Sequence, residues 1–446
     1  IKHPVDDIYY KINLTETKSL YEYEDEEGNL KLNKHTLRDV AIEIFKPIYV
    51  NETLYIYSKG VYQEVKIKYL KSILRQMVSQ TLNTSYHIDE TIRLIIEDLR
   101  VNYDLNAYSN ILNKHSLFLL NCKNGMVELS ENGATLKEHS PNYYSTIQIN
   151  AEYNKEAECP VFKKFLDRVV PDKNTQKVLQ EIVGYSLTRM TYNKKMIFIL
   201  TGEGDSGKST FLNNTIEALL PETAKAAVPL QDLQKRFDMA LLHNKVANIY
   251  ADLETEALKD IGKIKTATGG GDKSKLERKG KDAFFDTLYA KMIFSCNTLP
   301  RNYSADKSDA FYNRIMIIPF NQVIPEHEKD PLLDEKLKKE IDGIFKWAIE
   351  GLIRFIAAGF KFSHSHEIED KVNEYKKDNN PLLKFIDQYC TITNDEKDYI
   401  IRTKFQERYE KWCKEELNVE AVRPRTVKDF LNLKFNVEIK KKDDKA

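Results

Sequence analysis

Hydrophobic and polar positions along the chain change between the period of a strand and the period of a helix. Residues 54–57 alternate, and Gly60 precedes a further apolar pair, which predicts a β-hairpin over 54–62. Apolar positions at helical spacing predict amphipathic helices within 88–101, 159–190 and 342–360. With an extended patch at 117–129, the first 150 residues are expected to be mixed α/β.

Four apolar runs lie between residues 191 and 320, at 196–200, 246–251, 292–296 and 315–318. They alternate with helical stretches, which predicts an α/β domain with a mostly parallel sheet. The polar, Pro-terminated segment 378–381 predicts a linker, with short helices and a strand at 436–439 after it. We therefore expect an N-terminal α+β domain (1–158), a central domain with helical flanks (159–378) and a small C-terminal domain (379–446).

Composition narrows the choice of partners. The 446 residues include 68 Lys and Arg against 68 Asp and Glu, so a wholly basic nucleic-acid coating protein is excluded and only local patches can bind phosphate backbones. Five well-separated cysteines with no CxxC pair argue against a disulfide framework or a zinc ribbon and suit a reducing cytoplasm. No apolar stretch approaches the ~20 residues that span a bilayer, so no membrane partner is expected. The chain begins at Ile1 rather than Met, which leaves open an upstream segment.

A phosphate-binding loop is the most specific motif. The pattern G-x-x-x-x-G-K-[ST] follows the apolar run 196–200 and precedes a predicted amphipathic helix, so strand, loop and helix stand in the order that nucleotide binding requires. Lys208 is expected to bridge the β- and γ-phosphates of ATP, and the Ser209 hydroxyl to ligate Mg²⁺. The predicted ATP-binding residues are Gly202, Glu203, Gly204, Asp205, Ser206, Gly207, Lys208, Ser209 and Thr210.

Acidic residues follow the next predicted strand. Asp252 and Glu254 come after the run 246–251, and alternation along a strand would place both on one face. One carboxylate is expected to hold Mg²⁺, with Asp252 as the metal ligand, and the other to polarise the attacking water. Glu256 is a further candidate, and a strand that simply ends in a solvated acidic loop is the alternative.

Two further polar residues flank later strands. Asn297 follows the run 292–296 and is predicted to contact the γ-phosphate and orient water, although Asn before a Pro-containing turn is more often a turn former. Arg314 precedes the run 315–318 and is a candidate arginine finger acting on the site of a neighbouring subunit. A surface salt bridge is the alternative for Arg314.

A basic, Gly-rich segment lies between the acidic residues and Asn297. Residues 268–281 carry five basic side chains in nine positions after three glycines, which suits a hairpin that offers cations to phosphates without reading bases. An ordinary solvated Lys-rich loop is the alternative, and the loop contains no aromatic residue for base stacking. The predicted DNA-binding residues here are Lys275, Arg278, Lys279 and Lys281.

The order of these motifs resembles the superfamily-three helicases, and most closely their poxvirus/phage primase-helicase-like branch in phages, plasmids and mobile islands. The motif at 202–209, the acidic pair, the hairpin, the segment 291–300 and Arg314 follow the order of that group, and the resemblance covers about residues 50–380. It implies a P-loop AAA+-type ATPase core in a homo-hexameric ring whose pore hairpins grip single-stranded DNA. Lys208, Asp252, Glu254, Asn297 and Arg314 would be the catalytic residues. An Asp-x-Glu acidic motif and three glycines instead of two depart from the group.

Residues 382–440 resemble the small winged-helix domains attached to such helicases in mobile-element initiators. Arg423, Arg425 and Lys428 would then face origin duplex DNA from a helix capped by Thr426, and a protein-interaction domain is the alternative. No primase acidic motif is present, so primase activity is not assigned.

The leading hypothesis is an ATP- and Mg²⁺-dependent hexameric DNA helicase that acts on single-stranded and forked DNA. It would unwind duplex during replication initiation of a phage, plasmid or genomic island, in the cytoplasm of a bacterial host. The alternative is an ATP-switched origin-binding initiator without processive unwinding. A metabolic kinase or signalling NTPase would need a small-molecule acceptor site, for which the sequence offers no candidate.

Overall fold

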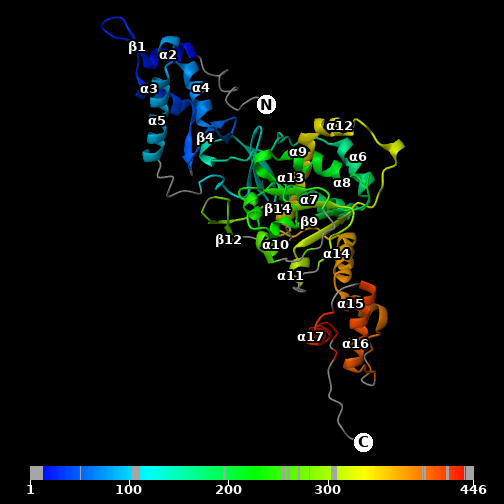
Figure 1. The fold of residues 1–446 in the computed structure, drawn as a ribbon. Coiled ribbons are helices and arrows are strands. Elements are labelled where there is room, and N and C mark those ends of the chain that lie inside the picture. Colours follow the sequence, from blue (N-terminus) through cyan, green and yellow to red (C-terminus); the bar gives the residue numbers. More distant parts are fainter. Residues whose placement is uncertain are drawn as a thin grey trace.

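The computed structural model describes residues 14–50, 52–102, 111–193, 197–253, 258, 262–269, 272–280, 282–302, 309–393, 395, 398–417, 421–435 and 437. Three groups of elements follow one another along the molecule, from an N-terminal lobe through a large α/β body to a small group of C-terminal helices (Figure 1).

Within the described residues, the N-terminal lobe combines four α-helices with two small antiparallel sheets. Its core joins side chains of all four helices, including Leu37, Phe45, Leu74 and Ile95, with Leu54 and Ile56 from the second sheet. The predicted hairpin is confirmed as β4 and β5, which turn at Lys59 and Gly60 with positive φ. The elements are α2 (Leu14–Tyr21), β1 (Glu22–Glu24), β2 (Leu30–Leu32), α3 (Lys34–Phe45), β3 (Ile48–Val50), β4 (Thr53–Ser58), β5 (Val61–Glu64), α4 (Ile67–Met77) and α5 (Ser85–Asn102).

A five-stranded parallel sheet forms the centre of the α/β body, in the order β10-β11-β14-β9-β15. Alternate residues of β9 enter two separate cores: Phe198 and Leu200 pack with one, Ile197 and Ile199 with the other. A strand buried on both faces needs apolar residues at every position, which explains the unbroken apolar runs. The strands are β9 (Ile197–Thr201), β10 (Lys225–Ala226), β11 (Ala247–Tyr250), β14 (Lys291–Cys296) and β15 (Ile315–Pro319). The prediction of a mixed α/β fold with a parallel sheet is confirmed.

Helices flank this sheet, and two of them pack closely together. In α7 and α13 the glycines sit at contacts that admit no side chain: a Cβ on Gly184 would lie 2.3 Å from the Ala348 carbonyl oxygen, and one on Gly351 would lie 2.5 Å from the Gln180 backbone. The helices of the body are α6 (Pro160–Val169), α7 (Lys173–Ser186), α8 (Lys208–Asn214), α9 (Ile216–Leu219), α10 (Gly262–Ala267), α11 (Asp309–Tyr312), α12 (Leu333–Lys339), α13 (Ile341–Ala357) and α14 (His366–Asp378).

A three-stranded antiparallel sheet, β6 (Leu119–Cys122), β7 (Gly125–Ser130) and β8 (Gly133–Lys137), belongs to the same body by its packing. Leu120 and Val127 share the core of Val183 in α7 and Phe345 in α13. The sequence predicts that this sheet belongs to an N-terminal domain that ends at residue 158. In the structure, its side chains instead join the core formed by α7 and α13 of the α/β body. Charge and periodicity do not reveal such long-range packing.

The C-terminal helices have a core of their own, formed by side chains such as Phe385, Tyr409, Trp412 and Val427. They are α15 (Pro381–Tyr389), α16 (Arg402–Trp412), a π-helical turn (Cys413–Leu417) and α17 (Pro424–Phe435). The predicted linker is shorter than its polar composition suggests, because only Asn379 and Asn380 separate α14 from α15. Of the strand predicted at 436–439, only Val437 is among the described residues, so the winged-helix assignment stays a prediction.

Among the described residues, no helix combines the length and the hydrophobicity that crossing a bilayer requires.

Candidate nucleotide and nucleic-acid sites

The segment Gly202–Ser209 connects the end of β9 to the start of α8, as the motif predicts. Gly207 has φ +85°, a left-handed conformation that favours glycine, and it precedes the first helical residue, Lys208. Gly202 has no room for a side chain, because a Cβ there would lie 2.1 Å from the Phe320 carbonyl oxygen. The loop is therefore held against β15 on one side and opens toward solvent at Glu203, Gly204 and Asp205, which are exposed.

Two of the three loop glycines, Gly202 and Gly204, provide a matched test of this packing. We expect Gly202→Ala to lower the free energy of unfolding by about 1–3 kcal/mol, because the backbone carbonyl of Phe320 must move to accept the methyl group. Gly204→Ala should change stability little, since nothing lies within 4 Å of its Cβ position. Urea or thermal unfolding of both variants measures the difference, and equal stabilities would contradict the packing described here.

Lys208 is enclosed by oxygen atoms. Its Nζ donates to the carbonyl oxygens of Gly202 (2.8 Å) and Glu203 (2.7 Å) and to Ser206 Oγ (3.1 Å), and its side chain is only 6% exposed. No carboxylate of the described residues lies within ion-pair distance of Lys208, and burial lowers the pKa of its ammonium. A buried cation with neutral partners only is suited to an anionic ligand, and the phosphates of a nucleotide fit that requirement.

Asn297 lies beside this lysine. Its Oδ1 accepts a hydrogen bond from Lys208 Nζ at 3.1 Å, although 89 residues separate the two in sequence. The contact follows from the sheet: β14 is hydrogen-bonded to β9, with Cys296 opposite Thr201, so both side chains follow the same edge. The alternative that Asn297 merely forms a turn does not account for this contact.

The acidic motif departs from its predicted geometry. β11 ends at Tyr250, and Asp252 has φ +58°, so it lies in a left-handed turn and not in a strand. The alternation argument that paired Asp252 with Glu254 is therefore wrong for Asp252. The turn is fixed by the Leu253 amide, which donates to the Ser295 carbonyl oxygen in β14 (2.8 Å). Asp252 is exposed at the same edge of the sheet as Asn297, and its charge partly offsets the lowering of the Lys208 pKa. Glu254 and Glu256 lie outside the described residues.

Of the remaining loop residues, Ser209 is exposed and Thr210 is half-buried. Ser209 stands on the first turn of α8, and Asp252 at the edge of the neighbouring strands. A hydroxyl and a carboxylate are oxygen ligands of the kind that Mg²⁺ prefers. The geometry thus brings together Lys208, Ser209, Asn297 and Asp252.

Arg314 lies at the other end of the sheet. It directly precedes β15, whose Ile315 is paired with Ile197 at the start of β9, while the loop follows the end of β9. Five strand residues, roughly 16 Å, separate the two levels. Its Nη1 donates to the Ala310 carbonyl oxygen (2.7 Å), and its buried Nε has no partner within the described residues. Arg314 is therefore remote from the loop of its own chain, and no carboxylate of the described residues forms an ion pair with it.

The basic segment forms a hairpin, β12 (Lys273–Leu276) and β13 (Phe284–Thr287). Two of its four described cations, Lys275 and Arg278, already have partners. Lys275 is paired with Glu277 at 3.2 Å, and Glu277 also accepts from Arg236 Nε at 2.6 Å. Arg278 contacts His243 Nδ1 at 3.0 Å and lies over the Phe284 ring. Lys279 is exposed at the tip and has no ion pair within the described residues, and Lys281 lies outside them.

Aromatic residues beside the hairpin escape the sequence pattern. Phe285 is 66% exposed, opposite Lys275 in the hairpin register, and Phe237 is 40% exposed. Phe237 lines a surface hollow together with Arg236, Lys275, Arg278 and Glu52. The expectation that the segment offers no stacking surface therefore applies to its tip only. Because Phe285 follows another phenylalanine in a strand, the sequence pattern does not predict that its side chain is exposed. Lys329, which pairs with Asp205 of the loop at 3.1 Å, was also missed because no motif contains it.

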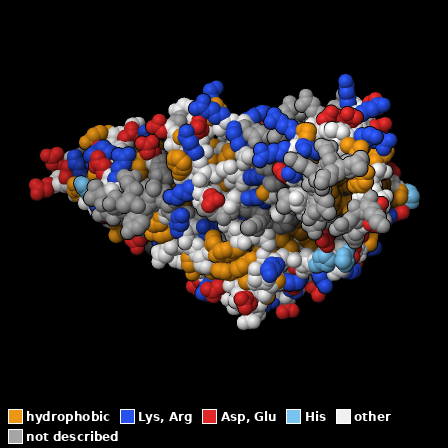
Figure 2. All heavy atoms as spheres, turned by 90° about the horizontal axis from the view of Figure 1, so that it is seen from below, with side chains coloured by type: hydrophobic (Ala, Val, Ile, Leu, Met, Phe, Trp, Pro, Cys, Tyr) orange, Lys and Arg blue, Asp and Glu red, His pale blue; other side chains and the backbone are white. Residues whose placement is uncertain are grey.

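On the face of the molecule seen from below, the described basic side chains do not form a single band (Figure 2). Figure 2, which shows the molecule from below, displays Lys and Arg side chains spread among Asp and Glu, with a hydrophobic area between them. On the C-terminal helices, Arg423, Arg425 and Lys428 are exposed near the start of α17. The prediction that Thr426 caps this helix is wrong, because α17 begins at Pro424 and Thr426 lies within its first turn.

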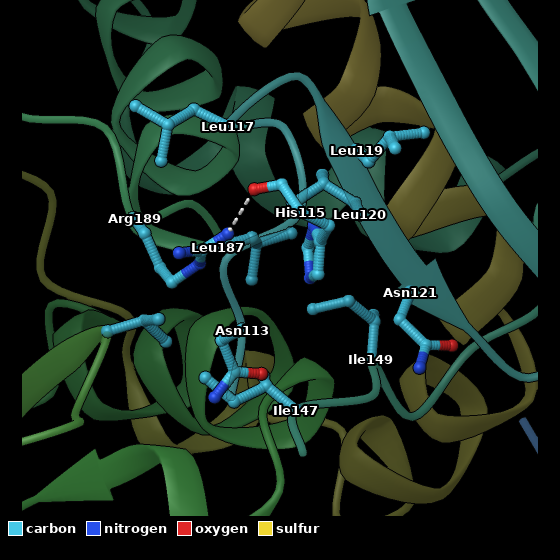
Figure 3. Close-up of a pocket in the computed structure, with 11 residues that line it drawn as sticks. Asn113, His115, Leu117, Leu119, Leu120, Asn121, Ile147, Ile149, Leu187 and Arg189 are labelled. Atoms are coloured by element: carbon cyan, nitrogen blue, oxygen red, sulfur yellow. Dashed lines mark hydrogen bonds between the residues drawn. The ribbon is translucent and has the colours of Figure 1, made fainter. Parts of the chain in front are cut away.

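A second hollow lies apart from the loop (Figure 3). It is lined by Asn113, His115 and Leu117 from the segment before β6, and by Leu187 and Arg189 after α7. Arg189 donates to the His115 carbonyl oxygen at 2.9 Å, and burial lowers the pKa of His115 to about 4. Its volume of about 20 Å³ has room for about one water molecule, so it does not fit a nucleotide.

Comparisons with known proteins match two parts of the chain to family models. Residues 46–171 match the model described as D5 N terminal like, and residues 200–314 match a family of unknown function, DUF5906. The chain is also 25% identical over 354 residues to "Putative helicase 184R" of Invertebrate iridescent virus 6. That alignment covers 68% of this chain and 35% of the viral protein, so the chain spans about a third of its relative.

Solved structures give weaker similarities. The A-form apo structure of the NrS-1 C-terminal region is 12% identical, covers 89% of this chain and 92% of that chain, and has a TM-score of 0.47. A structure of JCV helicase with a bound small molecule is 15% identical over 52% of this chain and 66% of that chain, with a TM-score of 0.28. The chain thus carries a D5 N-terminal-like region and is similar to a viral protein named as a putative helicase, and both findings agree with the resemblance to helicases that its motifs show.

Proposed function

We propose that this chain is an ATP-dependent DNA helicase with a P-loop AAA+-type core that works as a hexameric ring. The observation that carries the proposal is the contact between Lys208 and Asn297, which unites the glycine-rich loop and the adjacent strand end in one oxygen-lined site. The similarity to a viral protein named as a putative helicase supports the same function.

In this proposal the loop amides and Lys208 would bind the β- and γ-phosphates of ATP, and Ser209 with Asp252 would hold Mg²⁺. The metal would supply charge neutralisation on the phosphates. Asn297 would orient a water molecule next to Lys208, and Glu254 is the proposed base. The hydrogen bonds that Lys208 makes to Gly202 and Glu203 would be exchanged for bonds to phosphate oxygens.

The hairpin is the proposed contact with single-stranded DNA. We expect the double variant Lys279→Ala with Lys281→Ala to lose most of the stimulation of ATP hydrolysis by DNA, because Lys279 is exposed and forms no ion pair within the described residues, which leaves its ammonium available to a phosphate. Lys275→Ala is the matched control on the same hairpin and should have a smaller effect, since Glu277 already neutralises that ammonium. Strand displacement on a forked duplex and the salt dependence of DNA binding measure both.

Loss of unwinding in the double variant, with unchanged basal hydrolysis, would support the proposal. If the double variant separates strands and responds to DNA as the unaltered protein does, the role of the hairpin is wrong.

The second candidate is an ATP-switched initiator that binds origin duplex DNA without processive unwinding. It is favoured by the separate core of the C-terminal helices and by the exposed Arg423, Arg425 and Lys428 at the start of α17. Slow turnover and no strand displacement on a forked substrate, together with duplex binding that depends on these three cations, would support this candidate over the first.

A further inference from the structure

A group of metal-ligand side chains lies at the start of α14, away from the proposed nucleotide site. His364, His366 and Glu369 bring one nitrogen or oxygen atom each within 4.8 Å of one another, and all three residues are exposed. His364 Nε2 lies 3.3 Å from His366 Nδ1 and 3.8 Å from Glu369 Oε2. The sequence alone draws no attention to them, because two histidines and a glutamate match no zinc-finger spacing.

The local backbone explains why these three side chains meet. Ser365 is the N-cap of α14 and has extended dihedral angles, so its neighbours His364 and His366 point to the same side of the chain. Glu369 follows His366 by three residues, which places both on one face of the helix. Sequence order and helix geometry thus bring the three ligands together without a long-range contact.

The residues between the histidines and before them are anchored on the opposite side. The Ser363 amide donates to Glu181 Oε2 at 2.7 Å, and Ser365 Oγ is hydrogen-bonded to Thr175 Oγ1 at 2.8 Å. Ser365 is buried, and Glu181 is itself held by Arg354. Because the segment is fixed to α7 by alternate residues, the two imidazoles are presented outward at a constant spacing, which lowers the entropy cost of binding a shared ion.

The spacing suits a tetrahedral cation. With Zn–N bonds of about 2.0–2.1 Å, two ligand nitrogens of a tetrahedral zinc ion lie about 3.3–3.4 Å apart, whereas octahedral geometry would place them about 2.9 Å apart. The two histidine nitrogens match the first value. The carboxylate lies a few tenths of an ångström farther from His364 Nε2 than the ideal and within 4.8 Å of the His366 ligand atom, and as an exposed side chain it can approach by a rotation of its terminal torsion.

We propose that His364, His366 and Glu369 form a surface site for a zinc ion, with a fourth position left for water. Zinc accepts a set of two imidazoles and one carboxylate, whereas calcium and magnesium prefer sites made of oxygen ligands alone. The ion would join the segment after α13 to the first turn of α14. This inference does not depend on the proposed helicase function.

The test uses the full chain after chelator treatment and dialysis, titrated with ZnCl₂ in competition with a chromophoric chelator. We expect one zinc equivalent with a dissociation constant in the micromolar range or below, and a rise in the unfolding temperature on zinc addition. The variant His364→Ala with His366→Ala should bind that equivalent at least about tenfold more weakly and lose the temperature rise. Glu369→Gln keeps the shape of the side chain and should weaken binding by a smaller factor.

His327→Ala is the matched control, since His327 is exposed and close only to the single carboxylate of Glu328 within the described residues. It should bind zinc as the unaltered chain does. The proposal is overturned if the unaltered chain takes up no zinc at tens of micromolar, or if the double histidine variant binds the same equivalent with the same affinity. In the latter case zinc is bound elsewhere, and the contact between His364 and His366 is only a hydrogen bond.

Discussion

Replacing Lys208 with methionine is expected to reduce ATP hydrolysis at least about 100-fold, equivalent to roughly 2.7 kcal/mol of transition-state stabilisation. The ammonium is the one cation among the described residues that contacts both the loop and Asn297, and the developing charge on the transferred phosphoryl group requires it. Methionine keeps the length and apolar stem of the side chain. Steady-state kinetics measures the loss of ATP hydrolysis, and binding of a fluorescent ATP analogue measures the change in nucleotide affinity.

Lys291→Met is the control for this experiment, because Lys291 is also a buried lysine whose Nζ donates to backbone carbonyls. Those carbonyls belong to Thr188 (2.6 Å) and Tyr289 (3.1 Å). Lys291 is the first residue of β14 and so lies at the end of the sheet away from the loop. Burial lowers its pKa well below the usual value. This variant should hydrolyse ATP within a few-fold of the unaltered rate. Full hydrolysis by Lys208→Met, with both variants folded, would exclude the site proposed for ATP.

Mixing two inactive subunits is expected to restore hydrolysis if Arg314 acts on a neighbouring site. Arg314→Ala alone should lower turnover by about 10³-fold or more, while leaving the affinity for ATP nearly unchanged, because an arginine finger stabilises charge that appears only in the transition state. In a ring that contains Arg314→Ala and Lys208→Met subunits, some interfaces combine an intact loop with an intact arginine. Those interfaces should regain part of the unaltered rate.

The measurement is hydrolysis as a function of the mixing ratio, after conditions that allow subunits to exchange. A maximum at an intermediate ratio supports a shared site. Activity that stays at the sum of the two variants, with exchange demonstrated by a labelled subunit, contradicts it. Arg301→Ala is the control for loss of an arginine in the preceding segment. Mixing it with Lys208→Met subunits should not restore hydrolysis above the sum of the two variants.

Local geometry of the proposed site was largely predictable, because it is encoded within short stretches of sequence. An apolar run, a glycine-rich loop and a helix follow one another directly, so the segment Gly202–Ser209 could be placed from its neighbours alone. Asn297 could be placed as well, since parallel strands bring their carboxyl ends to one edge. The contact with Lys208 at 3.1 Å follows from both.

The remaining features depend on contacts that no local pattern contains. Asp252 leaves the strand geometry because a turn is fixed by Ser295 of another strand, and alternation along the chain cannot anticipate that. Glu277 pairs with both Lys275 and Arg236 and offsets one of their two positive charges, so a count of basic residues overestimates the charge that the hairpin offers. The exposure of Phe285 and Phe237 likewise depends on what the rest of the chain leaves uncovered.

The junction between α14 and α15 determines how the C-terminal helices can move. Asn379 accepts a hydrogen bond from the Asn302 amide and donates to the Tyr375 carbonyl oxygen, while the Tyr375 hydroxyl donates to the Pro300 carbonyl oxygen. Pro300 and Asn302 lie on the segment that leaves β14 after Asn297. The C-terminal helices are therefore joined to the α/β body by a short junction that is held by hydrogen bonds. A partner that reorients these helices would therefore displace the backbone at Pro300, three residues after Asn297, through the Tyr375 hydrogen bond. A shift of the backbone at Pro300 would in turn change the orientation of the C-terminal helices.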